Sequence, residues 1–142
     1  MRPVVNSRDR EVILLAKFLF NPLILMEEKK FPLYYKFYQL LKFLYLMVQN
    51  FPREHKYTLG REIIKKSWQC LDLILGINAV PKDQKKFLLQ KLSLTFDQLK
   101  IRLRMSQEVK IISVNQFAHL YTNYLKEIGD MIGGFMKWGQ RF

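Results

Sequence analysis

Apolar residues recur three and four positions apart from Phe31 onward, and glycine and proline gather between these periodic stretches. This spacing places apolar side chains on one face of an α-helix, and the sequence lacks the alternation that is typical of half-buried strands. The pattern predicts four helices, at about residues 33–50, 59–77, 82–105 and 114–135. Short connections between helices of similar length favour antiparallel neighbours, so we expect an all-α fold, an up-down-up-down antiparallel four-helix bundle.

Each of the first two predicted helices has an apolar face that should contribute to the core. In the first helix this face comprises Leu33, Phe37, Leu40, Leu44, Met47 and Phe51. In the second helix it comprises Ile63, Ile64, Trp68, Leu71, Ile74 and Leu75. Tyr34, Tyr38 and Tyr45 border the first stripe, and amphipathic rings in such positions are typical of the edge of a core or of an interface.

The polar stretch FPREHKYTLGREI separates the first two helices. Phe51 and Pro52 should end the first helix, because proline disfavours the helical conformation in the residue before it. We expect the charged residues to form an exposed corner and Thr58 to cap the second helix. Ser113, followed three positions later by Gln116, predicts a capping box at the start of the fourth helix.

Residues 1–30 are expected to form a peripheral N-terminal extension, and residues 31–142 the bundle domain. Residues 12–26 are strongly apolar, but this segment is too short to span a bilayer and is interrupted by Lys17 and Pro22. We therefore expect no stable membrane insertion and predict a short helix that is capped by Asn6 or Ser7 and ends before Pro22. Attachment of this segment to a membrane surface is a less favoured alternative.

The third predicted helix is apolar on two opposite sides. At about 100° per residue, one side carries Leu88, Leu89, Leu92, Phe96, Leu99 and Leu103. The other side carries Phe87, Leu94, Ile101 and Met105. Burying each large apolar side chain contributes about 1.5–3 kcal/mol, and a bundle core needs only one stripe. We therefore expect the second stripe to be the interface of a homo-oligomer, unless residues 1–30 fold over it.

The chain carries 24 Lys and Arg residues against 12 Asp and Glu residues, which gives a net charge of +12. Such a charge attracts polyanions, because each phosphate that is neutralised releases condensed counterions. We expect nucleic acid or an acidic protein partner to bind cations of the third helix and of the region around the second helix. These residues are Arg53, Lys56, Arg61, Lys65, Lys66, Lys82, Lys86, Lys100, Arg102 and Arg104.

Groups that could support catalysis are sparse. His55 and His119 are far apart in sequence, with Cys70 as the only other soft ligand, so we expect no metal site. Gly133 and Gly134 come at the end of a helix and do not follow a strand, which argues against a phosphate-binding loop. We expect neither an enzyme nor a cofactor. The single cysteine favours a reducing compartment, and hence a cytoplasmic location.

Several short motifs resemble the accessory variability determinant (Avd) proteins of diversity-generating retroelements. These motifs are Phe51 and Pro52, then Arg53, Tyr57, Leu59, Gly60 and Arg61, followed by LRMSQEVKIIS and the terminal EIGDMIGGFMKW. The likeness covers about residues 31–138. The chain departs from the family near its end, where Phe135 rather than tryptophan follows the paired glycines.

This resemblance implies a four-helix bundle that assembles into a pentameric ring with a basic surface. It also implies two partners, the reverse transcriptase of the retroelement and its template RNA. In that family the accessory protein supports the error-prone cDNA synthesis that diversifies a target gene, while the enzyme supplies the active site. The second apolar stripe and the excess of positive charge agree with these implications.

Two alternatives differ from this interpretation. A related four-helix-bundle family is encoded in intervening sequences of ribosomal RNA genes. Its members usually carry an Asn-Ile-Ala-Glu-Gly run at the end of the second helix, where this chain reads LILGINAVPK, which argues against it. The other alternative is a basic helical adaptor that binds only proteins, which a lack of RNA binding at low salt would favour.

Overall fold

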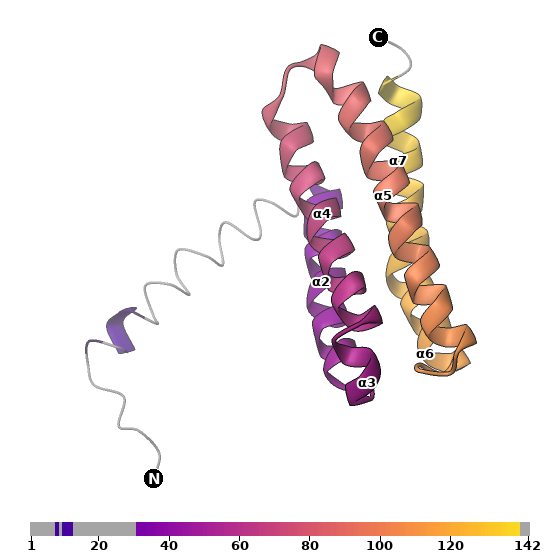
Figure 1. Ribbon diagram of the computed structural model, residues 1–142. Helices are drawn as coiled ribbons and strands as arrows, with labels where there is room; N and C mark the ends of the chain where they lie inside the picture. Colours follow the sequence, from indigo (N-terminus) through magenta and orange to yellow (C-terminus); the bar gives the residue numbers. More distant parts are fainter. Residues whose placement is uncertain (1–7, 9, 13–30, 140–142) are drawn as a thin grey trace.

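Four long helical segments lie side by side in the structure, a computed structural model that describes residues 8, 10–12 and 31–139 (Figure 1). In chain order the elements are α2 (Pro32–Gln49), α3 (Arg53–Lys56), α4 (Leu59–Ala79), α5 (Lys82–Glu108), α6 (Val114–Leu120), the π-helix η1 (Tyr121–Leu125) and α7 (Lys126–Gly139). Residues 8 and 10–12 are also helical. The expected helix ends at Asn6 or Ser7 and at Pro22 lie outside the described residues.

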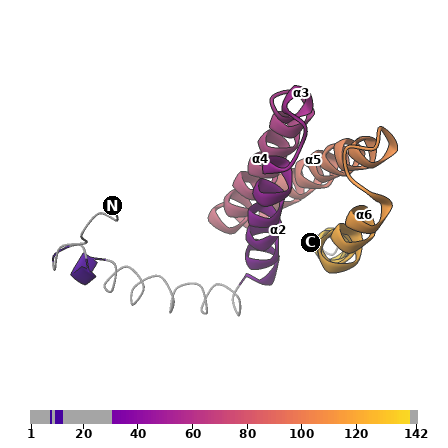
Figure 2. The same ribbon diagram turned by 90° about the horizontal axis from the view of Figure 1, so that it is seen from below.

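The chain runs alternately up and down through α2, α4, α5 and the continuous segment formed by α6, η1 and α7. The short helix α3 and the start of α6 lie at one end, and the connection between α4 and α5 lies at the other (Figure 1). Helix α4 contacts both α2 and α5, and α7 contacts both α5 and α2. Figure 2 shows α7 nearly end-on in the same arrangement. No strand occurs among the described residues, and the predicted all-α, antiparallel bundle is confirmed.

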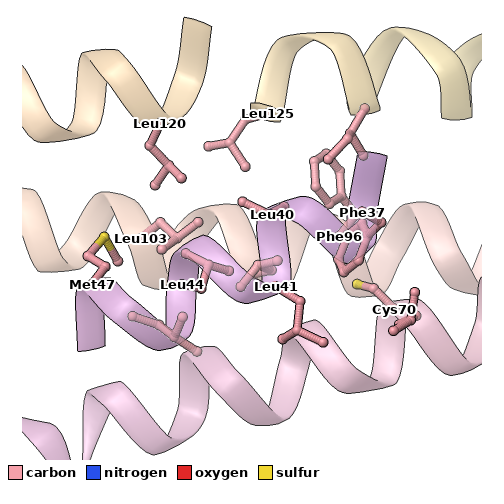
Figure 3. Close-up of a cluster of buried hydrophobic side chains, with 14 of the residues drawn as sticks. Phe37, Leu40, Leu41, Leu44, Met47, Cys70, Phe96, Leu103, Leu120 and Leu125 are labelled. Carbon is pink, nitrogen blue, oxygen red and sulfur yellow. The ribbon is translucent and has the colours of Figure 1, made fainter. Parts of the chain in front are cut away.

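The core is formed by the apolar faces that the spacing of α2 and α5 predicts (Figure 3). Phe37, Leu40 and Leu44 of α2 are completely buried, as is Leu103 of α5. The rings of Phe37 and Phe96 meet edge to face, with their centroids 6.3 Å apart. Regular helical periodicity is therefore sufficient to identify the buried face of these two helices.

The rotation of α4 differs from the prediction. Trp68 and Leu75, which the spacing assigned to the core, are 42% and 48% exposed, so that assignment is wrong. The buried face of α4 instead includes three small residues, Gly60, Ser67 and Cys70. Small side chains let α4 pack closely against its neighbours, and the buried Ser67 hydroxyl donates to the carbonyl of the preceding turn at 2.7 Å. The bulky indole of Trp68 is accommodated on the outside.

The corner between α2 and α4 contains the short helix α3. Helix α2 ends at Gln49, and Phe51 is buried while Pro52 lies directly before α3, as a helix stop at these residues requires. Thr58 precedes α4, but its hydroxyl donates to the carbonyl oxygen of Glu54 at 3.1 Å and makes no bond to the α4 backbone. The predicted side-chain cap is therefore wrong, because α3 provides a nearer acceptor.

The fourth helical segment begins with the predicted capping box. The backbone N–H of Gln116 donates to the Ser113 hydroxyl at 3.0 Å, and the backbone N–H of Ser113 donates to the Gln116 side chain at 2.8 Å. The segment then widens into η1. Here the side-chain amide of Asn123 donates to the carbonyl oxygen of His119 at 2.9 Å.

Candidate functional site

The second apolar stripe of α5 lies on the surface of the bundle. Its residues are Phe87, Leu94, Ile101 and Met105, which are 67%, 59%, 61% and 48% exposed. We call them the outer stripe. Because the opposite side of α5 is buried, this helix carries apolar residues on both sides, as its sequence predicts. The role of the outer stripe as an interface remains a prediction.

A second apolar surface lies over the groove between α2 and α4. It comprises Tyr38, Tyr45, Trp68 and Leu75, all of which are exposed, and we call it the aromatic patch. The indole N–H of Trp68 donates to the Tyr45 hydroxyl at 2.7 Å, and the two rings meet edge to face. Tyr38 and Tyr45 were expected at the edge of a core or of an interface, but the spacing placed Trp68 and Leu75 in the core, so the surface as a whole was not predicted. The small residues Ser67 and Cys70 were the signal that could have revealed the correct rotation.

Four of the predicted cations, Lys82, Lys86, Lys100 and Arg104, lie on α5 in two separate groups. Lys82 and Lys86 lie in the first turns of the helix, whereas Lys100 and Arg104 lie in its second half. Lys100 comes fourteen positions after Lys86, which corresponds to about 21 Å at a rise of about 1.5 Å per residue. Lys100 pairs with Asp97 of the same helix at 3.1 Å, which reduces its net effect on a distant anion.

A cation of α7 joins the second of these groups. The Lys100 ammonium lies 5.1 Å from the centroid of the Phe96 ring. The α7 residue that faces this ring is Gly129, since a Cβ there would lie 3.8 Å from it. Lys126 lies one turn before Gly129 in α7. Because α7 runs antiparallel to α5, one turn back from Gly129 corresponds to one turn forward from Phe96, which is the level of Lys100. We call Lys100, Arg104 and Lys126 the basic face; Lys126 was not among the predicted residues.

Two of the predicted cations hold α4 and α5 together. The Arg102 guanidinium donates to the Glu62 carboxylate at 3.0 Å and to the carbonyl oxygen of Gln98 at 2.9 Å. The hydrogen bond and charge of Arg102 lower the pKa of the Glu62 carboxyl below its ordinary value. The Lys66 ammonium donates to the Gln98 side chain at 2.9 Å. Both cations therefore stabilise the pairing of the two helices.

The remaining predicted cations gather at the corner end of the bundle. Arg53 and Lys56 belong to α3, and Arg61 and Lys65 lie in the first two turns of α4. Arg53, Arg61 and Lys65 are exposed to solvent. The structure thus divides the predicted binding residues among the corner, the two halves of α5 and the contact between α4 and α5.

Within the described part of the chain, no three His, Cys, Asp or Glu side chains gather in a way that could hold a metal ion. Burial raises the pKa of the Cys70 thiol to about 12. A cavity of ≈ 200 Å³ at the end of the bundle is lined mainly by apolar side chains, among them Leu33, Ile74 and Phe135. No helix in residues 31–139 is long and apolar enough to cross a membrane, and most of the apolar segment 12–26 lies outside the described residues.

Comparison with known protein families gives a match over most of the chain. The model of a family described as bAvd-like matches residues 28–138, which include almost the whole bundle. No curated protein and no solved structure matches the chain.

Proposed function

This chain belongs to the bAvd-like family, and on that premise we propose that it is a non-catalytic accessory protein of a diversity-generating retroelement. The observation that carries the proposal is the extent of the match, which runs from residue 28 to residue 138 and so spans the bundle from α2 into α7. In this role the protein binds the retroelement's reverse transcriptase and its template RNA and supports mutagenic cDNA synthesis. It acts in the cytoplasm, where these partners meet.

The proposed working form is a ring-shaped homo-oligomer, a pentamer by resemblance to the Avd family. The exposed outer stripe supports this proposal, because four large apolar side chains gain free energy when a second copy removes them from water. Replacing Leu94 and Ile101 by aspartate should yield monomers. Sedimentation velocity measures this directly, with Val114→Asp as a control, since Val114 is equally exposed but lies on α6. An assembly that survives both stripe substitutions would refute the assignment.

RNA is proposed to bind the basic face. The net charge of +12 and the similar level of Lys100 and Lys126 on two neighbouring helices support this assignment, because cations on neighbouring helices can release several counterions from one stretch of backbone. For single strands the logarithm of the affinity changes with the logarithm of salt concentration by about −0.7 per phosphate contact. Removing two contacts should therefore flatten this dependence by about 1.4.

The experiment compares two double variants that lose the same charge. Lys100→Gln with Lys126→Gln removes two cations of the basic face. Lys91→Gln with Lys110→Gln removes two exposed lysines elsewhere. Fluorescence anisotropy with single-stranded RNA at several salt concentrations should show a flatter salt dependence for the first variant only. Equal slopes for both variants would place the RNA on another surface, and no RNA binding at low salt would favour the adaptor alternative.

The functional partner is tested by reconstitution. Reverse transcription from a retroelement template should require this protein, and the variant with Lys100→Gln and Lys126→Gln should give less cDNA than the variant with Lys91→Gln and Lys110→Gln. Sequencing of the DNA around the gene provides an independent test. A reverse-transcriptase gene and near-identical repeats that differ at adenines are expected there. Their absence, together with cDNA synthesis that does not depend on this protein, would overturn the proposal.

A further inference from the structure

An open hollow of ≈ 380 Å³ lies between the second half of α2 and the beginning of the α6 segment. It is lined by apolar side chains of α2 and by neutral polar side chains of both segments, chiefly Phe43, Leu46, Asn50, Asn115, Gln116 and His119. No Lys, Arg, Asp or Glu side chain of the described residues lines it. An apolar wall with a few neutral polar groups suits a flat, uncharged ring, whereas a buried charge would need a partner of opposite sign.

The polar side chains of the hollow keep hydrogen-bonding groups for a ligand. The Asn123 amide donates to Nδ1 of His119 at 3.0 Å, so the neutral imidazole carries its proton on Nε2 and can donate from there. Gln116 uses its side-chain oxygen in the capping box, which leaves its amino group to donate. The Asn115 side chain has no hydrogen-bond partner among the described residues and offers both a donor and an acceptor. The hollow can therefore satisfy a ring that carries donors and acceptors along its edge.

A row of rings holds the wall of the hollow in place. The Phe43 centroid lies 5.3 Å from that of Tyr124 and 5.5 Å from that of His119, with interplanar angles of 35° and 38°. The bond from Asn123 fixes the His119 ring further. Because these contacts exist before a ligand arrives, little side-chain freedom is lost on binding. Unpaired RNA bases are typically bound by stacking on such rings and by hydrogen bonds to their edges.

We propose that this hollow binds one unpaired nucleobase of an RNA strand, with hydrogen bonds from Asn115 and His119 to the edge of the base. The inference rests on the proposed RNA binding and adds to it a contact that does not depend on charge. Lys126 of the basic face follows His119 by seven positions on one continuous helical segment, which corresponds to about 10 Å at a rise of about 1.5 Å per residue. A strand whose phosphates contact Lys126 can therefore place a nearby base in the hollow.

The test compares two double variants that lose the same residue types. The hollow variant carries Asn115→Ala and His119→Ala, and the control carries Asn78→Ala and His55→Ala, neither of which lines the hollow. Circular dichroism and sedimentation check that both keep the helicity and assembly of the wild type. Fluorescence anisotropy measures binding to a short oligoadenylate, since an asparagine amide can pair with N6 and N7 of adenine, and to an abasic oligoribonucleotide of the same length.

The hollow variant should bind oligoadenylate at least about 5-fold more weakly than the control, which is the lower end of the effect of losing one stacked base. Both variants should bind the abasic strand equally, because that strand keeps its phosphates and lacks bases. The salt dependence should be the same for both variants, since neither substitution removes a phosphate contact.

The other outcomes separate this inference from the proposed function. Equal binding of oligoadenylate by the two variants would overturn the base site, while RNA binding at the basic face would stand if the variant with Lys100→Gln and Lys126→Gln still flattened the salt dependence. An equal loss on both strands would also overturn it, because the contact would then be to the backbone. Weaker binding of reverse transcriptase with unchanged RNA affinity would assign the hollow to a protein side chain instead. A wild type that binds neither strand at low salt would overturn both proposals.

Discussion

Replacing Gly60 by alanine should destabilise the protein, although alanine is the better helix former. Gly60 lies in the first turn of α4, next to the end of α2. A Cβ on Gly60 would lie 2.7 Å from Cγ1 of Val48 and 3.4 Å from Cδ2 of Phe51. Val48 and Phe51 are buried, and the β-branched valine has few alternative rotamers, so neither side chain can move away easily.

The net effect follows from two opposing contributions. Alanine gains at most about 1 kcal/mol over glycine in a helix. Forcing an extra methyl group into a packed core costs about 1–3 kcal/mol. We therefore expect Gly60→Ala to lower the free energy of unfolding by up to about 2 kcal/mol, which corresponds to a decrease in Tm of up to about 8 °C for a chain of this size.

Urea unfolding at one fixed protein concentration measures this change, since the concentration of an oligomer affects its apparent stability. Gly133→Ala is the matched control, because nothing lies within 4 Å of a Cβ at that helical position, and it should leave stability unchanged or raise it. Adding Val48→Ala to Gly60→Ala should give a double variant more stable than the sum of the single effects by at least about 0.5 kcal/mol. Equal effects of the two glycine substitutions would refute the steric argument.

Three further predictions follow from single contacts. Arg102 lowers the pKa of the Glu62 carboxyl, so the pair stabilises the fold fully at pH values above the ordinary pKa of 4.5. This contribution is lost as the pH falls through the lowered pKa. Glu62→Gln should therefore reduce the loss of stability on acidification, which urea unfolding at several pH values measures. Ser113→Ala removes half of the capping box with Gln116 and should cost about 1 kcal/mol in the same assay. With its pKa raised to about 12, the buried Cys70 thiol should react with a thiol reagent at pH 8 only after urea is added, and rapid reaction of the native protein would contradict its burial.

The sequence was sufficient for features that depend on regular helical geometry. A rotation of about 100° per residue assigns Leu99 and Leu103 to the core and Leu94 and Ile101 to the surface, and the structure agrees in each case. The capping box was predictable because both of its hydrogen bonds join residues three positions apart. Family membership, expected from short motifs around Gly60 and near the C-terminus, is confirmed by the match to the bAvd-like model.

Features that depend on how the helices pack were not predictable in the same way. Hydrophobicity alone placed Trp68 in the core, whereas close packing selects the small residues Ser67 and Cys70 for the buried face of α4. The pair of Arg102 with Glu62 joins residues forty positions apart, so it depends on the axial alignment of α4 and α5. Lys126 joins the basic face for the same reason, because only the packing of α7 on α5 brings it to the level of Lys100.

Helix α5 has a different environment on each of its sides, and this division bears on how the proposed functions combine. Its inner side forms the core, and the side facing α4 is tied by Arg102 to Glu62. The outer stripe is exposed and is the surface proposed for a second copy, and the side facing α7 carries Lys100 at the level of Lys126. Because the outer stripe and the basic face are different sides of one rigid helix, assembly through the stripe would leave the cations exposed. It would also repeat them at a fixed spacing around the ring, so that one RNA strand could contact several copies and bind more tightly than one copy alone allows.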